Sequence, residues 1–176
     1  MRIIAGRFGG RRLSAPPGRA TRPTSDRVRE ALFSILGPLD GARVLDLYAG
    51  TGALGIEALS RGAASAVFVE RDARVVAGLR GNLEALGAEA DVRRADALAA
   101  LRDARKRGET YDLVLCDPPY RLAPDLGGPL SEALVPVLAA SARVVTESDR
   151  RAPLDLHLPL TDERRYGDTL IRIHLP

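Results

Sequence analysis

From residue 43 onward, strand-like and helix-like segments alternate along the chain, and this alternation limits the possible folds most strongly. Strands are expected at 43–48, 66–70, 91–96, 111–117 and 143–147, with helices between them and a loop at 121–128 before a helix through Leu138. Such alternation is typical of a doubly wound α/β sheet with right-handed crossover connections. Two later segments, 154–160 and 169–175, alternate with a period of two and are expected to close the sheet.

The residues before this alternation predict an extension and one helix. Residues 1–14 predict a hairpin, because Gly9-Gly10 favours a tight turn between short segments. A linker rich in Pro, Gly, Arg and Thr follows at 15–24, and a helix begins near Thr24 or Ser25. We therefore expect a basic hairpin and linker at 1–24 and a single α/β domain at 25–176.

Acidic side chains stand at or near the ends of the first four expected strands. These residues are Asp46, Glu70, Asp96 and Asp117. In a doubly wound sheet, ligands bind beyond the carboxyl ends of the strands. Four acids at one edge repel one another unless a ligand or arginines organise them. The sequence therefore predicts a ligand site at this edge.

A glycine-rich turn follows the first expected strand. Gly50, Gly52 and Gly55 form a G-x-G-x-x-G pattern between a strand and a helix, and Glu70 follows Gly50 by 20 residues. This pattern indicates a cofactor that contains a nucleoside, with the acid positioned for ribose hydroxyls. From these residues alone, a nicotinamide cofactor stays an open alternative.

Two acids favour S-adenosylmethionine over a dinucleotide. Asp46 at the end of the first strand suits the cation of a methionine group and opposes a pyrophosphate. Asp96 is positioned to accept a hydrogen bond from an adenine amino group. Simpler roles stay open for each acid: Asp96 as the cap of a helix starting at Ala97, Glu70 as a solvated carboxylate, and Asp46 as a turn-organising residue.

Asp117-Pro118-Pro119-Tyr120 ends an almost wholly apolar segment that predicts a buried parallel strand. The prolines leave no N–H at 118 and 119, so this corner presents hydrogen-bond acceptors. Asp117 and the Pro118 carbonyl can accept from an exocyclic amine of a base, and Tyr120 offers a stacking face. The alternative is a proline-rich turn that only closes the strand.

The positive charge of the chain is concentrated at its beginning. The net charge is +3, but residues 1–30 carry +6 and the remainder carries −3. An attached basic segment is typical of nucleic-acid binding, and guanidinium groups both fork onto phosphate and stack on bases. The candidate RNA-binding residues are Arg2, Arg7, Arg11, Arg12, Arg19, Arg22 and Arg27. A solvated or sheet-covering basic segment is the simpler alternative.

Several classes of protein are disfavoured by what the chain lacks. Cys116 is the single cysteine, and the two histidines, His157 and His174, lie in expected strands near the C-terminus, so no metal site is predicted. No run of 18 apolar residues exists, so membrane insertion and secretion are not expected. We expect a cytoplasmic protein that is a monomer.

The motifs resemble a known family. The segment 46–52, Glu70, Asp96 and the segment 117–120 are similar to the four motifs of Rossmann-like amino-methyltransferases. A more specific resemblance, to the bacterial 16S ribosomal RNA guanine(966)-N(2)-methyltransferases, is found in segments 2–6, 11–13, 21–33 and 166–169. The resemblance implies a Rossmann-like methyltransferase fold: a mixed seven-stranded sheet with helices on both faces and an N-terminal β-hairpin extension.

The resemblance also implies an activity and roles for residues. The activity is methyl transfer from S-adenosylmethionine to the N2 amine of a flipped-out guanine in 16S ribosomal RNA, within an assembled or partly assembled small subunit. Asp117, Pro118 and Tyr120 would be catalytic. The cofactor would be held by Asp46, Tyr48, Gly50, Thr51, Gly52, Glu70, Arg71, Asp96, Ala97 and Asp117.

Three other functions stay open from the sequence. The Asp-Pro-Pro-Tyr corner also suits a DNA adenine-N6 or cytosine-N4 methyltransferase, although the chain leaves little room for a DNA-recognition domain. A nicotinamide oxidoreductase fits the glycine pattern alone. A non-enzymatic RNA-binding or ribosome assembly protein would use only the basic segment.

Overall fold

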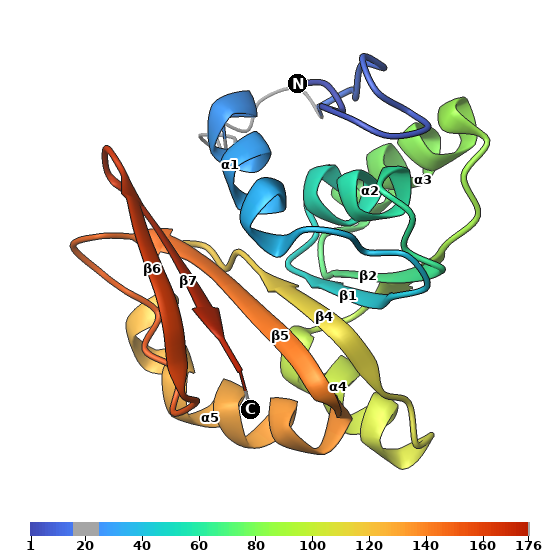
Figure 1. The fold of residues 1–176 in the computed structure, drawn as a ribbon. Helices are drawn as coiled ribbons and strands as arrows, with labels where there is room; N and C mark the ends of the chain where they lie inside the picture. Colours follow the sequence, from blue (N-terminus) through green and yellow to red (C-terminus); the bar gives the residue numbers. More distant parts are fainter. Residues whose placement is uncertain (16–24, 176) are drawn as a thin grey trace.

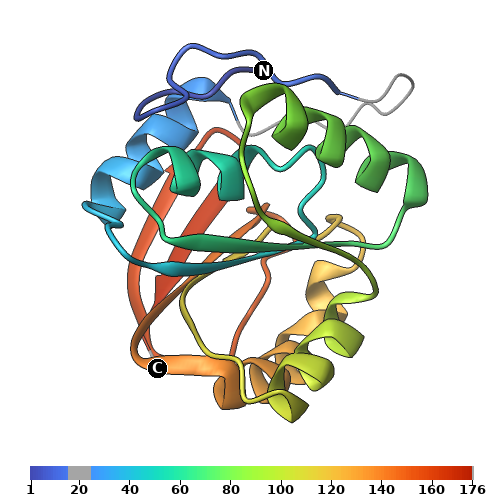
Figure 2. The same ribbon diagram turned by 90° about the vertical axis from the view of Figure 1, so that its right-hand side faces the viewer.

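The computed structural model describes residues 1–15 and 25–175 (Figure 1). The linker expected at 15–24 therefore lies almost entirely outside the described residues, and so do Arg19 and Arg22. The described chain forms one sheet with helices on both faces, as the sequence predicts (Figure 2). None of its helices has both the length and the apolar character needed to cross a membrane.

The sheet has seven strands in the order β3-β2-β1-β4-β5-β7-β6. These are β1 (Arg43–Leu47), β2 (Ser65–Glu70), β3 (Asp91–Arg94), β4 (Tyr111–Cys116), β5 (Leu138–Asp149), β6 (Leu160–Tyr166) and β7 (Thr169–His174). The first five strands pair in parallel, and β7 pairs antiparallel with both β5 and β6. The predicted mixed seven-stranded sheet is confirmed, and its strand order reverses between β1 and β4.

Within the described chain, three helices cover one face of the sheet and two cover the other, as Figure 2 shows. The first group is α1 (Asp26–Leu36), α2 (Ala53–Ser60) and α3 (Ala73–Leu86); the second is α4 (Ala97–Lys106) and α5 (Ala123–Leu134), which a short 3-10 turn at Val135–Val137 extends. Alternate residues of each central strand enter opposite cores: Val44 packs beneath α1–α3 and Leu45 packs against α4 and α5.

Local capping signals explain where the helices begin and end. The Ser25 hydroxyl accepts a hydrogen bond from the Val28 N–H, which confirms the predicted start of α1. Asp72 and Asp96 cap α3 and α4 in the same way. Gly87 ends α3 in the left-handed conformation that L residues avoid. The strand–helix alternation therefore follows from side chains that are close in sequence.

The loop predicted at 121–128 is wrong, because α5 already begins at Ala123. Its glycines and prolines suggested a loop, yet they serve the packing of this helix. A Cβ atom on Gly127 would overlap the Asp155 carbonyl of the segment that crosses α5, so only glycine permits this approach. The expected helix through Leu138 ends instead at Leu134, and β5 starts at Leu138.

The strand predicted at 154–160 is also wrong. Only Leu160 of that segment belongs to β6, which runs on to Tyr166. Leu154 and Leu156 are buried with α4 and α5, and the His157 N–H donates to the Ser131 hydroxyl of α5. The segment contacts α5 and the Arg172 and His174 side chains of β7 but forms no strand ladder, so its period of two reflects one buried side of an extended chain.

The N-terminal segment is an antiparallel loop rather than a regular hairpin. Arg2 and Arg12 form an isolated bridge, and the backbone turns between them through residues 5–10. Ile3, Phe8 and Leu13 are buried in the same core as α1–α3. The segment, which we call the arm (residues 1–14), is therefore held mainly by the helices beneath it and only slightly by its own pairing (Figure 1).

The contact between the arm and α2 depends on Gly6. This residue has a φ of +79°, and a Cβ atom on it would overlap the Ser60 carbonyl. We predict that Gly6→Ala lowers the free energy of unfolding by about 3 kcal/mol or more, through backbone strain and the clash together.

The matched control is Gly10→Ala. Gly10 has a φ of +80° but no atom within 4 Å of the added Cβ, so it should cost only about 1–2 kcal/mol. Urea unfolding of both variants measures the difference, and equal losses would show that the close approach to Ser60 is unimportant.

Candidate cofactor and substrate site

Acidic side chains mark the carboxyl ends of five adjacent parallel strands. Asp96 and Glu70 follow β3 and β2, Asp46 lies in β1, and Asp117 follows β4. Glu147 lies in β5, one residue beyond the pairing of Thr146 with Cys116, and is therefore level with Asp117. The four acids predicted from the sequence are thus confirmed at one edge of the sheet, and a fifth joins them.

The Asp-Pro-Pro-Tyr corner lies beside the glycine turn. Leu47 of β1 pairs with Cys116 of β4, so the chain leaves both strands at the same level, at Tyr48 and Asp117. This is the position where the strand order reverses, since β1 is flanked by β2 on one side and β4 on the other. Ligands of doubly wound sheets bind at such a point.

The glycine turn has the backbone that its sequence suggests. Gly50 and Gly52 have φ values of +55° and +83°, and Gly52 starts α2 without any side-chain cap. Tyr48, at +60°, is the one non-glycine residue of the described chain with a positive φ. A bulky residue in that conformation is strained, and such strain is concentrated at functional sites.

Asp46 is buried against the helix that follows the turn. Its exposed fraction is 2%, and its Oδ2 accepts a hydrogen bond of 2.9 Å from the Gly55 N–H. Burial raises the pKa of the Asp46 carboxyl to about 8, and nearby Glu70 adds to the rise while the Gly55 bond opposes it. Asp46 therefore holds the turn against α2, which is one of the two roles that its position suggested.

Glu70 and Asp96 also hold backbone N–H groups around the site. Glu70 accepts from Gly50 in the turn at 3.3 Å and from Asp72 at 2.9 Å. Asp96 accepts from Leu98 and Ala99 through Oδ1, as the cap of α4. Hydrogen bonds therefore fix both carboxylates at the carboxyl ends of their strands.

Tyr48, Arg71 and Ala97 complete the predicted cofactor set. Tyr48 is close enough to Asp96 and Arg71 for their charges to act on its hydroxyl, and burial raises the Tyr48 pKa above its ordinary value. Arg71 is exposed directly after β2, and Ala97 is buried as the first residue of α4. Arg71 and Asp96, which follow β2 and β3, therefore lie near Tyr48, which follows β1.

At the corner itself, the proline backbone forms a tight turn. The Leu122 N–H donates to the Pro119 carbonyl at 2.8 Å, rather than to the Pro118 carbonyl. Pro118 is buried, whereas Tyr120 has an exposed fraction of 37%. Asp117, directly after β4, is partly exposed.

The charge of Asp117 is opposed by its neighbours. Burial raises the pKa of its carboxyl well above the ordinary value, and the negative charges of Glu147 and Asp46 raise it further. Glu147, whose exposed fraction is 3%, was not among the residues predicted from the sequence. The signal for it was an acid at the end of the fifth expected strand, the same signal that identified the other four.

The described arginines of the arm lie on the surface, as expected of a basic segment. Arg2 pairs with Asp26, Arg7 lies over the Phe8 ring at 4.4 Å, and Arg11 donates to the Ala85 carbonyl. Arg12 and Arg27 are exposed as well. Arg29, outside the predicted set, is fully buried and donates to the Arg2 carbonyl, so its role is structural.

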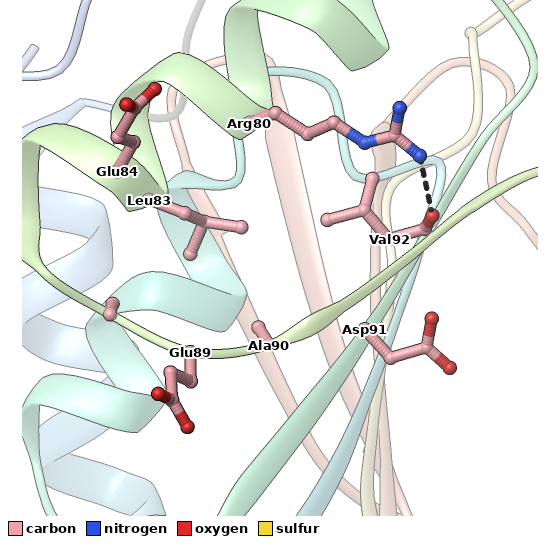
Figure 3. A pocket seen from close by; sticks show the side chains of 8 residues that line it. Arg80, Leu83, Glu84, Glu89, Ala90, Asp91 and Val92 are labelled. Carbon is pink, nitrogen blue, oxygen red and sulfur yellow. Dashed lines mark hydrogen bonds between the residues drawn. The ribbon is translucent and has the colours of Figure 1, made fainter.

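A hollow on the protein surface lies elsewhere. Figure 3 shows its lining by residues 88–92 together with Arg80 and Leu83 of α3, where Arg80 donates to the Val92 carbonyl. Its volume is about 510 Å³. Because it lies where the chain enters β3, it is at the opposite end of the strands from the acids and the glycine turn.

Known proteins with similar sequence and structure identify the family. Residues 1–174 match the family described as Conserved hypothetical protein 95. "Ribosomal RNA small subunit methyltransferase D" of Escherichia coli K12 is 45% identical over 123 residues, which are 69% of this chain and 61% of that protein. The chain thus aligns with less than two thirds of that relative's length.

Solved structures support the same grouping. A hypothetical protein of Thermus thermophilus, TTHA0928, superposes with a TM-score of 0.87 at 32% identity, over 100% of this chain and 99% of that one. The SAM-dependent methyltransferase from Agrobacterium tumefaciens, at 18% identity and a TM-score of 0.58 over 84% of this chain and 59% of that one, shares the fold alone. The fold is the Rossmann-like methyltransferase fold, the resemblance drawn from the sequence is confirmed, and the chain belongs to the Conserved hypothetical protein 95 family.

Proposed function

We propose that this protein transfers a methyl group from S-adenosylmethionine to the exocyclic N2 amine of a guanine in small-subunit ribosomal RNA. One observation supports the proposal most strongly: the Asp-Pro-Pro-Tyr corner and the glycine turn follow neighbouring strands at the same level. A methyl donor at the turn and a base at the corner would therefore lie next to each other. The E. coli relative named as a small-subunit RNA methyltransferase supports the substrate class. Such a substrate would place the protein, acting as a monomer, in the cytoplasm.

The electrostatics of the mouth favour a cationic ligand. Loss of hydration raises the pKa values of Asp46 and Asp117, and the negative charges of neighbouring acids raise them further. A sulfonium and an ammonium group would relieve that repulsion, whereas the pyrophosphate of a dinucleotide would increase it. This is the physical reason to prefer S-adenosylmethionine over a nicotinamide cofactor.

The remaining residues fit the rest of the cofactor. Glu70, fixed by the Gly50 and Asp72 N–H groups, would accept from the ribose hydroxyls. Asp96 uses Oδ1 for its cap, and its other oxygen would accept from the adenine amine. The uncapped start of α2 at Gly52 offers N–H groups to a carboxylate. When bound, the cofactor supplies an electrophilic methyl group.

The corner would prepare the amine for attack. Asp117 and the Pro118 carbonyl accept its two N–H bonds, which directs the nitrogen lone pair toward the methyl carbon. The new N–C bond would form as the S–C bond breaks, the sulfur would keep the electron pair and leave as S-adenosylhomocysteine, and one amine proton would pass to the Asp117 carboxylate or to water. Tyr120, exposed at the mouth, replaces the stacking that a flipped base gives up, an effect of about 1–3 kcal/mol.

A DNA methyltransferase that modifies adenine N6 or cytosine N4 is the second candidate, because the same corner suits any exocyclic amine. Its supporting observation is the Asp117–Tyr120 geometry alone. The basic arm on the α1–α3 face and the ribosomal relatives favour RNA. Transfer of a labelled methyl group to unmodified small subunits, compared with duplex DNA, distinguishes the two, and mass spectrometry of the RNA then identifies the base.

Removing the Asp117 carboxylate should abolish methyl transfer. We predict that Asp117→Ala lowers the rate by at least ~100-fold, because the amine is no longer aligned, while the protein still binds S-adenosylmethionine. Asp125→Ala is the matched control, since Asp125 is an exposed acid in the first turn of α5. Near wild-type methylation by the Asp117 variant would refute its assigned role.

Cofactor affinity should depend on pH through Asp46. Its pKa of about 8 means that the carboxyl is mostly protonated at pH 6 and ionises as the pH rises toward 8. Because the ionised form attracts a cation, we predict several-fold tighter binding of S-adenosylmethionine at pH 7.5 than at pH 6. Asp46→Asn should bind more weakly at pH 7.5 and lose this dependence in calorimetric titrations; an unchanged profile would contradict it.

Charge removal in the arm should weaken the binding of RNA. We predict that Arg11→Gln with Arg12→Gln lowers small-subunit affinity and reduces the slope of log K against log salt by about 1–2, one phosphate contact for each arginine. The matched control, Arg102→Gln with Arg105→Gln, removes exposed charges from α4 on the opposite face. Filter binding at several salt concentrations measures both, and identical slopes would mean that the arm does not contact phosphate.

A further inference from the structure

One buried side chain joins the arm to the glycine turn. Asn82 of α3, whose exposed fraction is 4%, accepts a hydrogen bond of 2.9 Å from the Ser14 N–H. Its Nδ2 donates to the Ser14 carbonyl at 3.0 Å and to the Thr51 carbonyl at 3.1 Å. A single amide group thus contacts both the end of the arm and the residue between Gly50 and Gly52.

Other contacts place the arm and the turn on the same support. The Thr51 hydroxyl contacts the Met1 sulfur at 3.7 Å, a second link between the two segments. Leu79, one turn before Asn82 on α3, lies so close to Gly52 that a Cβ atom there would overlap it. The glycine turn therefore rests on α3 through Leu79 and is tied to the arm through Asn82.

The arm is fixed separately to α2, which follows the turn. Glu57, fully buried, accepts from the Ile4 and Ala5 N–H groups at 2.7 and 3.1 Å. The Ser60 hydroxyl accepts from the Phe8 N–H and donates to the Ala5 carbonyl. These contacts hold the beginning of the arm without touching the glycine turn, which makes them a natural control for Asn82.

We propose that Asn82 is a positioning residue that couples the arm to the cofactor turn, so that RNA bound to the arm and cofactor bound to the turn strengthen each other. The inference rests on the proposed function, because it takes the arm as an RNA-binding surface and the turn as the cofactor site. Displacement of Ser14 or of Thr51 leaves the buried Asn82 amide with an unpaired N–H. Ordering one partner therefore favours the ordered position of the other.

Such coupling is reciprocal and can be measured from either ligand. The probe is the affinity for unmodified small subunits with and without saturating S-adenosylhomocysteine, which avoids turnover. In the wild type we expect saturating S-adenosylhomocysteine to tighten subunit binding at least ~5-fold. The ratio that reports the coupling is this factor, the affinity with S-adenosylhomocysteine divided by the affinity without it. Asn82→Leu, which keeps the branched shape but loses all three hydrogen bonds, should bring the ratio of the two affinities to within about twofold of one.

Two further variants separate coupling from simple stability. Ser60→Ala loosens the arm on α2 but leaves Asn82 intact, so it should retain the wild-type ratio even if its melting temperature falls. Asn82→Asp keeps the acceptor for the Ser14 N–H but loses both donor bonds, to the Ser14 and Thr51 carbonyls, so it should lose the ratio while Ser14 keeps one of its two bonds to α3. This second Asn82 variant serves if Asn82→Leu does not fold.

The outcomes are distinguishable from those of the proposed function. A wild-type ratio in the Asn82 variants, or an equal loss of the ratio in Ser60→Ala, would overturn the role of Asn82. A wild type that methylates small subunits but shows a ratio of one would overturn the coupling and leave the proposed function standing. A wild type that neither binds nor methylates small subunits would overturn both.

Discussion

The burial of apolar parallel strands at the centre of the sheet is the constraint on which the site depends. Leu47 and Cys116 are buried as a neighbouring pair, and a slip of one residue would move Tyr48 away from the level of Asp117. That register places Tyr48 and Asp117 side by side and sets the other acids along the same edge. The free energy gained by burying the strands therefore holds charged groups together that would otherwise move apart.

The repulsion among these acids is itself informative. Burial first, and then the charges of neighbouring acids, raise the pKa values of Asp46 and Asp117, so their ionised forms are unfavourable in the free protein and a bound cation would stabilise them. Backbone N–H groups from Gly50, Gly55 and Asp72 compensate only part of the charge. Buried polar groups also hold the arm: Glu57 fixes it to α2, and Asn82 links it to the glycine turn at the centre of the site.

Most of the fold was predictable because its signals are local. Apolar runs located the central strands, helical patterns located α1–α4, and caps such as Ser25 and Gly87 fixed helix ends. The errors lie at α5 and at 154–160, where the chain follows partners distant in sequence. Gly127 reads as a loop residue, yet it permits a helix to approach the Asp155 carbonyl, and Leu154 and Leu156 pack on α5 instead of pairing in the sheet.

The sequence by itself determined the Rossmann-like class, the acids at the strand ends, the glycine turn and the Asp-Pro-Pro-Tyr corner, because each depends on residue type and short spacing. Only the tertiary structure decided the strand order that brings Asp117 beside the turn, the addition of Glu147 to the acidic edge, and the contact of Asn82 with Ser14 and Thr51. These depend on packing between segments 30 to 70 residues apart in the chain, such as Thr51 with Asn82 and Ser14 with Asn82. No local pattern specifies such contacts, since they follow from the way whole faces are buried together.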